Sequence, residues 1–266
     1  ILGLETYPPI HLVAAMDFSS FGLIPSLIQF SNRMVYQDKL IVYPSANIND
    51  PNMGVSFKKV DGIYKSSTNP KEAGEMIKGA KIHMKTFPNR SLGLVVMNNP
   101  QSELLNAMWR KERQTDSFIQ KYEAKWKTHN AGLEKFFIKN LESVQGDERD
   151  VMFIGTVYGP ESQGGRTYQR FGPINGIRGK KRLNVLFSRA KKKIVTFSSM
   201  TAADITAKEE NNPGAFMLKS WLEYSATGIL DTGSIAGREP DSDFEIFVAQ
   251  KIQSMGFEPV PQVGVK

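Results

Sequence analysis

Short β-rich segments alternate with helical patterns along most of this 266-residue chain. The candidate strands are rich in branched and aromatic residues, and they lie at 55–60, 92–97, 138–144, 151–157 and 194–199. Between several of them, apolar residues recur at helical spacing. Such alternation predicts a mostly parallel sheet with helices on both faces, because each crossover helix packs back onto the sheet. The predicted fold class is therefore α/β.

Helices are predicted from spacing and from end signals. The clearest starts at Pro70, with Asn69 as its cap and Glu72 three residues after the cap. A long helix is expected from about residue 101 to 126, and another from residue 211 to a stop at Gly228.

The composition changes near residue 228. Turn-forming residues without apolar periodicity predict a linker over 229–241. Residues 242–266 then carry one amphipathic helix, which is too short to build a domain. We therefore expect one domain over 1–228, a linker, and the first element of a truncated second domain. The chain begins without methionine and ends abruptly, which suggests a piece of a longer protein.

Composition excludes several classes of protein and site. No apolar run approaches the roughly 18 residues of a membrane-spanning helix, so no membrane partner is expected. The absence of cysteine excludes disulfides and thiolate metal sites and fits a cytoplasmic protein. His11, His83 and His129 are isolated and show no metal-ligand spacing. The sequence also lacks a G-x-x-x-x-G-K-[ST] phosphate loop, so the chain alone is not a complete ATPase.

The formal net charge of the whole chain is +7, and its basic residues are concentrated in one part of the sequence. No acidic residue lies between Glu161 and Asp204, and the basic residues there are Arg166, Arg170, Arg178, Lys180, Lys181, Arg182, Arg189, Lys191, Lys192 and Lys193. A stretch of one sign attracts phosphates of a nucleotide or a nucleic acid. A solvated surface is the alternative explanation for a charge run of this kind.

An acidic turn that contains glycine occupies residues 145–150, between two apolar segments. We expect it at an edge of the sheet, where α/β proteins bind ligands. Gly146 lets the backbone approach a ligand, and Glu148 can accept hydrogen bonds from ribose hydroxyls. A tight turn with solvated charges explains the same residues equally well.

A basic helix is predicted at about 180–190. Its buried stripe consists of Leu183, Leu186, Phe187 and Ala190. Arg182 and Arg189 are seven residues apart and are expected along one edge of that stripe. An arginine there could reach across a domain cleft to a γ-phosphate. The alternative is a surface helix whose arginines pair with carboxylates.

These two regions together resemble the last two motifs of superfamily 1 helicases. The segment "NLESVQGDERDV" (140–151) resembles motif V, and "KRLNVLFSRAKKKIVTFSS" (181–199) resembles motif VI. Segments 26–45, 54–77 and 91–105 are similar to one bacterial family of large helicases, in the same branch as the eukaryotic RNA-surveillance helicase. The resemblance covers nearly all of the chain from about residue 26. It implies the second RecA-like domain, of P-loop NTPase fold, from the motor of an ATP-dependent DNA helicase.

The resemblance also implies roles for individual residues. Glu148 would contact the nucleotide ribose and Arg189 the γ-phosphate, which makes them the candidate catalytic residues. Gly146 and Arg182 complete the candidate nucleotide-binding set, with Arg182 bracing the motif. The cofactors would be ATP and Mg²⁺. A first RecA-like domain in cis, absent from this chain, would supply the phosphate loop and the Mg²⁺ ligands, so this domain alone is expected to be inactive.

A second set of residues is expected to face single-stranded DNA, with RNA as an open alternative. By the same resemblance, Gln145 and Gly146 would couple the nucleotide state to the nucleic-acid strand. The candidate nucleic-acid residues are Gln145, Asn98, Asn99, Gln101, Lys180 and Lys181.

Two further features leave alternatives open. The helicase family carries an arginine before "SLIQFSN", and residues 17–25 contain none, so a non-catalytic nucleic-acid-binding scaffold is one rival. The segment "DSDFEIFVAQKIQSMGFEPVPQVGV" (241–265) resembles the start of a restriction-endonuclease-like domain related to very-short-patch-repair nucleases. Glu245 would match a nuclease residue, although a capping box explains it as well. The other rival is therefore a positioning module for a C-terminal nuclease.

Overall fold

The computed structural model describes residues 24–40, 50–230, 250–251 and 253–254. Its centre is a five-stranded sheet in the order β1-β5-β4-β2-β3, and every pair of neighbouring strands is parallel. The strands are β1 (Gly54–Lys59), β2 (Leu92–Val96), β3 (Phe137–Asn140), β4 (Arg149–Gly155) and β5 (Ala190–Ser198). The predicted α/β class with a parallel sheet is confirmed.

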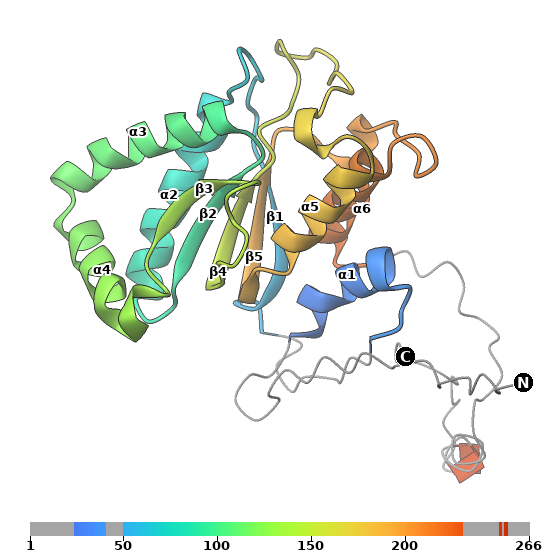
Figure 1. The fold of residues 1–266 in the computed structure, drawn as a ribbon, viewed down its shortest axis with the longest axis horizontal. Coiled ribbons are helices and arrows are strands. Elements are labelled where there is room, and N and C mark those ends of the chain that lie inside the picture. Colours follow the sequence, from blue (N-terminus) through green and yellow to red (C-terminus); the bar gives the residue numbers. More distant parts are fainter. Residues whose placement is uncertain (1–23, 41–49, 231–249, 252, 255–266) are drawn as a thin grey trace, which may run out of the picture.

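Helices cover both faces of the sheet (Figure 1). One layer consists of α2 (Pro70–Thr86), α3 (Asn99–Thr115) and α4 (Ser117–Thr128), and the other of α1 (Pro25–Tyr36), α5 (Gly176–Phe187) and α6 (Pro213–Thr227). Consecutive residues of β5 show the two faces. Thr196 accepts a hydrogen bond from the Trp221 indole of α6 at 3.0 Å, whereas Phe197 lies against Gly79 of α2. Short 3-10 helices occupy η1 (His129–Gly132), η2 (Gly172–Ile174) and η3 (Ala202–Asp204).

The core lies on both sides of the central strands. Every residue of β2 and β4 is buried, as expected for parallel strands covered by two helical layers. In the second layer, the ring of Phe187 stacks on Trp221 with centroids 3.8 Å apart, and Phe30 of α1 meets Trp221 edge-on at 4.9 Å. These contacts fix the end of α5 against α6 and α1 of the same layer.

The start of α2 agrees with its predicted cap but uses different partners. The Asn69 side chain accepts a hydrogen bond from the Glu72 backbone N–H at 3.1 Å. The side chain of Gln101, not that of Glu72, accepts from the Asn69 backbone N–H, at 2.7 Å. The Glu72 carboxylate instead accepts from the backbone N–H of Val157 at 2.8 Å. Val157 has a φ of 70°, which a β-branched residue rarely adopts, so Glu72 holds a strained backbone at the carboxyl end of β4.

Other elements differ from the predicted ones. The helix expected over 101–126 is two helices, because Asp116 ends α3 and its carboxylate caps the backbone N–H groups of Phe118 and Ile119 in α4. The strand expected over 138–144 ends at Asn140, where the side chain of Asn140 accepts from two turn N–H groups. Helix α6 and its left-handed stop at Gly228 are as predicted.

Part of the predicted organisation lies outside the described residues. This applies to nearly all of the 229–241 linker, to Glu245, to most of the expected terminal helix, and to residues 17–23 of the segment without arginine.

Candidate functional site

Glu148 and Arg189 lie side by side at the end of the sheet where its parallel strands begin. We call this end the amino edge, and the end where the strands finish the carboxyl edge. Glu148 directly precedes β4 and Arg189 directly precedes β5, and these two strands are parallel neighbours. The backbone N–H of Arg149 donates to the Arg189 carbonyl at 3.2 Å, and the Arg189 guanidinium lies 3.7 Å from the Glu148 carboxylate. Two groups 41 positions apart in the sequence are thus brought together because their strands begin at the same edge.

This location corrects one expectation. The general rule for α/β sheets places ligands at the carboxyl ends of the strands. Glu148 and Arg189 stand at the opposite edge, and β2 separates β3 from β4, so the turn at 145–150 does not join neighbouring strands. The chain from Asn140 to Arg149 instead runs back from the carboxyl end of β3 to the amino end of β4.

Arg189 is held by the end of α5. Its Nε donates to the Val185 carbonyl at 2.8 Å, and its side chain keeps 20% of its surface exposed. Helix α5 ends at Phe187, so Arg189 lies in the following turn and Ala190 begins β5. We expected Arg182 and Arg189 to lie along one edge of the same helix. This is wrong for Arg189, which lies beyond the end of α5. The turn points the Arg189 guanidinium toward Glu148.

Gly146 has the backbone freedom that the sequence predicts. Its φ is 85°, in the left-handed region that favours glycine, and a Cβ added there would meet no atom within 4 Å. No neighbouring side chain requires a glycine at this place. The backbone is open to an incoming group, and Gln145 beside it is exposed.

A hollow of about 350 Å³ lies where the 140–148 segment meets α5. Its lining residues are Leu141, Glu142, Gln145, Arg182 and Val185. Arg182 donates to the Pro173 carbonyl at 2.9 Å and pairs with Glu142 at 3.1 Å. Arg182 therefore braces α5 against both neighbouring segments. Arg182 and Arg189 both pair with carboxylates here, as the alternative for a surface helix requires, and both pairs are partly exposed.

The sequence reasoning missed two residues that support this edge. Arg149 is 1% exposed, and its guanidinium donates to the carbonyls of Lys135 at 2.8 Å and Glu148 at 2.6 Å. Asp150 accepts from the Ser91 backbone N–H at 2.9 Å and pairs with Lys192 at 2.9 Å. Burial acts to raise the pKa of the Asp150 carboxyl, but the bonds from Lys192 and Ser91 outweigh it and lower the pKa. The available signal was a charged pair directly before an apolar strand.

Asn98 and Asn99 lie at the opposite edge, after β2. Asn98 caps α3, accepting from the Gln101 backbone N–H, and it donates to the Ser67 carbonyl at 2.9 Å. Asn99 bonds Glu103 at 2.6 Å and Asn140 at 3.2 Å near the surface. Gln101 is fully buried, and its amide accepts from and donates to the Asn69 backbone. The expectation that Gln101 faces nucleic acid is therefore wrong, because its amide fixes the start of α2.

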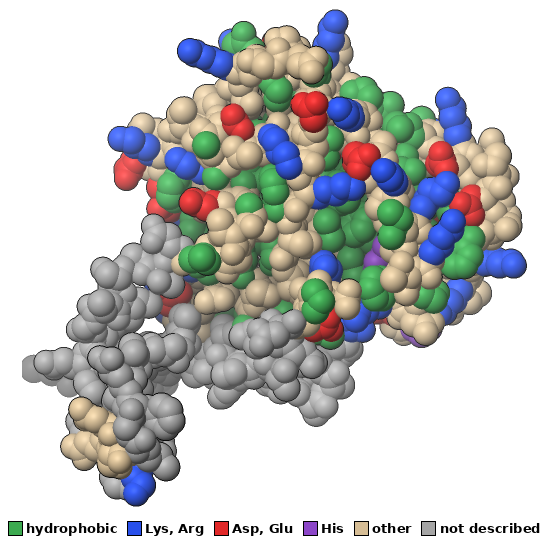
Figure 2. All heavy atoms as spheres, turned by 180° about the vertical axis from the view of Figure 1, so that it is seen from behind, with side chains coloured by type: hydrophobic (Ala, Val, Ile, Leu, Met, Phe, Trp, Pro, Cys, Tyr) green, Lys and Arg blue, Asp and Glu red, His purple; other side chains and the backbone are tan. Residues whose placement is uncertain are grey.

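The basic stretch is partly neutralised by carboxylates from other segments. Lys180 pairs with Glu209 at 2.7 Å and is 18% exposed, whereas Lys181 is exposed on α5. Lys191 pairs with Glu134 in the same way. Figure 2 shows basic side chains spread over the rear face with acidic ones between them, many of them over the flank formed by α3 and α4. Carboxylates of other segments thus offset part of the charge of this stretch, and Arg166, Arg170 and Arg178 are its exposed arginines.

The family follows from comparison with known sequences. The sequence model of the AAA_12 family, described as an AAA domain, matches residues 19–201. The chain belongs to this family. The AAA domain is 30% identical over 202 residues to an "uncharacterized ATP-dependent helicase MG140 homolog" of Mycoplasma pneumoniae, and 29% identical to the MG140 helicase of Mycoplasma genitalium. These alignments cover 75% and 74% of the chain, which spans 17% of the length of each relative.

The chain was also compared with solved structures, and one of the matches is from a helicase. It is the C-terminal domain of a possible DNA helicase from Lactobacillus plantarum WCFS1, with 11% sequence identity and a TM-score of 0.37. The match covers 68% of this chain and 88% of that one. Within the described ranges of the AAA domain, no helix is long and apolar enough to cross a membrane.

Proposed function

We propose that this AAA domain is the second RecA-like domain of a superfamily 1 motor that hydrolyses ATP and moves along single-stranded DNA in the cytoplasm. The observation that carries the proposal is the meeting of Glu148 and Arg189 at one sheet edge, 3.7 Å apart and both accessible. A carboxylate that can accept from ribose hydroxyls and a guanidinium that can bind a phosphate stand together there. Two relatives named as ATP-dependent helicases support the same assignment.

In this proposal, the amino edge faces a nucleotide held by a first domain. ATP supplies the phosphoryl bond whose cleavage drives the motor, and the first domain supplies the phosphate loop and Mg²⁺ ligands. On this chain, Arg189 leaves its loose pair with Glu148 and stabilises the charge that develops on the γ-phosphate. Glu148 then binds the ribose, and Gly146 permits close approach of the backbone. Among the described residues, no group of three or more acidic or histidine side chains is arranged to hold a metal.

The same segment offers a route from nucleotide to strand. Gln145 and Arg182 both line the hollow between the 140–148 segment and α5, and Gln145 belongs to the same turn as Glu148. Closure of the domains around a nucleotide would alter the Arg182–Glu142 pair and move Gln145. Further contacts to phosphates and bases, which give little sequence preference, would come from Asn98, Asn99 and Lys181.

The test is ATP hydrolysis by the longer protein that joins this domain to a phosphate-loop domain, with and without single-stranded DNA. We expect DNA to stimulate turnover and Arg189→Ala to lower it at least a hundredfold, about 3 kcal/mol of transition-state stabilisation. Arg178→Ala removes an exposed arginine of α5 away from the edge and serves as the matched control, with unchanged turnover. Equal rates for the two variants would refute the role of Arg189.

A second candidate function is a scaffold that binds nucleic acid without hydrolysing ATP. The stretch 17–25, without the arginine that the resembling helicases carry, favours it. A protein that binds single-stranded DNA but shows no turnover, with or without DNA, would establish the scaffold. A module that positions a C-terminal nuclease would instead show metal-dependent nicking that is independent of Arg189.

A further inference from the structure

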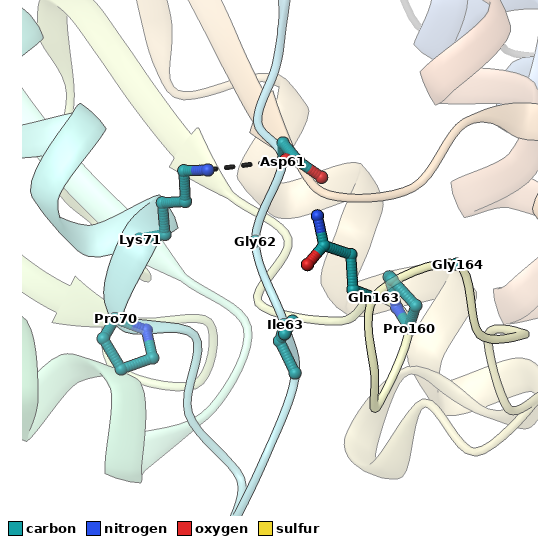
Figure 3. Close-up of a pocket in the computed structure, with 8 residues that line it drawn as sticks. All are labelled: Asp61, Gly62, Ile63, Pro70, Lys71, Pro160, Gln163 and Gly164. Atoms are coloured by element: carbon teal, nitrogen blue, oxygen red, sulfur yellow. Dashed lines mark hydrogen bonds and ion pairs between the residues drawn. The ribbon is translucent and has the colours of Figure 1, made fainter.

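A second hollow lies at the carboxyl edge of the sheet, opposite Glu148 and Arg189. It has a volume of about 340 Å³ and is lined by Asp61, Gly62, Ile63, Pro70, Lys71, Pro160, Gln163 and Gly164. These residues come from the segment after β1, the start of α2 and the loop after β4 (Figure 3). The volume is at the lower end of the roughly 300–1,000 Å³ of small-ligand pockets. The site is therefore large enough for one ring system.

The walls of this pocket are held by the backbone. The N–H of Tyr64 donates to the Pro160 carbonyl at 2.9 Å. This bond joins the segment after β1 to the loop after β4. An antiparallel bridge between Pro160 and Thr167 closes the base of that loop. Gly62 packs so tightly that a Cβ there would lie 2.3 Å from the Asn69 side chain, so this position of the lining cannot carry a side chain.

The lining combines apolar surfaces with a few polar groups. Ile63 is 41% exposed, and Pro70 and Pro160 present apolar rings beside it. In Figure 3, the Gln163 amide extends from its loop toward Asp61 and Gly62. An amide offers both a donor and an acceptor, as the edge of a nucleobase requires.

The charge around the pocket favours a phosphate-bearing ligand. Lys71 faces Asp61 at 3.5 Å, and their side chains are 60% and 86% exposed. An ion pair this exposed contributes little, so the ammonium can turn to a phosphate. The loop beyond Gln163 adds Arg166 and Arg170, both exposed, and Tyr168 with 60% exposure. Exposed aromatic rings among cations are typical of surfaces that bind single strands.

We propose that this pocket receives one unstacked base of single-stranded nucleic acid. Ile63 and Pro160 pack on the base, Gln163 faces its hydrogen-bonding edge, and Lys71 contacts an adjoining phosphate. The inference rests on the proposed function and extends the strand path from Asn98. The hydrogen bond from Asn98 to the Ser67 carbonyl joins the two parts of that path.

The experiment measures binding of this chain to a fluorescently labelled thymidine oligonucleotide and to an abasic strand of equal length, by anisotropy. Ile63→Ala is expected to weaken binding of the oligonucleotide about tenfold and to leave abasic binding unchanged, because only a base covers the Ile63 side chain and removes it from water. Ile82→Ala is the matched control, since Ile82 is 57% exposed on α2 and outside the pocket.

Lys71→Ala is expected to weaken binding of both strands, because the lysine contacts a phosphate. Lys78→Ala, which removes a 67% exposed lysine from the same helix, should leave both affinities unchanged. If the chain binds DNA and the pocket variants bind as tightly as the unaltered chain, the base pocket is refuted and the proposed function is not. If the unaltered chain binds neither strand, the pocket and the strand-binding part of the proposed function fail together. The Arg189 test of the nucleotide edge is independent of both.

Discussion

At the residue scale, the most unusual group is the fully buried carboxyl of Glu72. Burial raises its pKa from the ordinary 4.5 to about 8, although hydrogen bonds from Val157 and Thr156 act against the rise. Near neutral pH the folded protein therefore holds a proton on Glu72 that the unfolded chain has released. The contribution of Glu72 to the free energy of unfolding is full below about pH 4.5 and is lost as the pH rises toward 8.

We predict that Glu72→Gln abolishes this dependence. The Glu72 carboxyl accepts from the Val157 N–H and from the Thr156 hydroxyl, and a glutamine of the same length keeps an amide oxygen that can accept there. The variant should match the unaltered chain at about pH 5 and exceed it at about pH 8.5, by on the order of 3–5 kcal/mol. Urea unfolding at the two pH values measures the difference. If the variant exceeded the unaltered chain in free energy of unfolding by the same amount at both pH values, Glu72 would not be protonated in the folded protein.

At the scale of the element, α5 depends on one close backbone contact. A Cβ at Gly179 would lie 1.5 Å from the Ile174 carbonyl oxygen, so the helix must shift to admit any side chain. We predict that Gly179→Ala lowers the free energy of unfolding by about 1–3 kcal/mol. Thermal unfolding measures the loss.

The matched control is Gly74→Ala in α2, where an added Cβ would meet only Met108 at 4.0 Å. Because alanine is the better helix former, this variant should be stabilised by roughly 0.5–1 kcal/mol. If both substitutions have the same effect, the close contact at Gly179 is not what positions α5.

The helices also show where the local sequence is sufficient to predict the ends of an element and where it is not. The start of α2 was predictable because Asn69 and Pro70 are local signals, and the structure uses both. The break between α3 and α4 was missed, although Asp116 is a common cap, because apolar residues on both sides keep helical spacing. The turn at Ser188 was missed for a similar reason, since Ala190 fits the helical stripe and yet begins β5.

At the scale of the whole molecule, the alternation of strands and helices along the sequence predicts the fold class, but it does not predict the order of the strands in the sheet. Nothing local in the sequence places β4 beside β5, so the amino-edge location of Glu148 and Arg189 depends on contacts distant in sequence. Gln101 illustrates the same limit. Its type and position fit a strand-binding residue, and only packing against Asn69 shows that its amide is already used.

The central claim is that Glu148 binds the nucleotide while Arg189 acts on the transition state. The most direct measurement compares nucleotide affinity with single-turnover hydrolysis in the longer protein for Glu148→Ala and Arg189→Ala. We predict that Arg189→Ala lowers the single-turnover rate about a hundredfold or more with little change in affinity, because its contact strengthens as charge develops. Glu148→Ala should mainly weaken nucleotide binding. Unchanged single-turnover hydrolysis in Arg189→Ala would contradict the account.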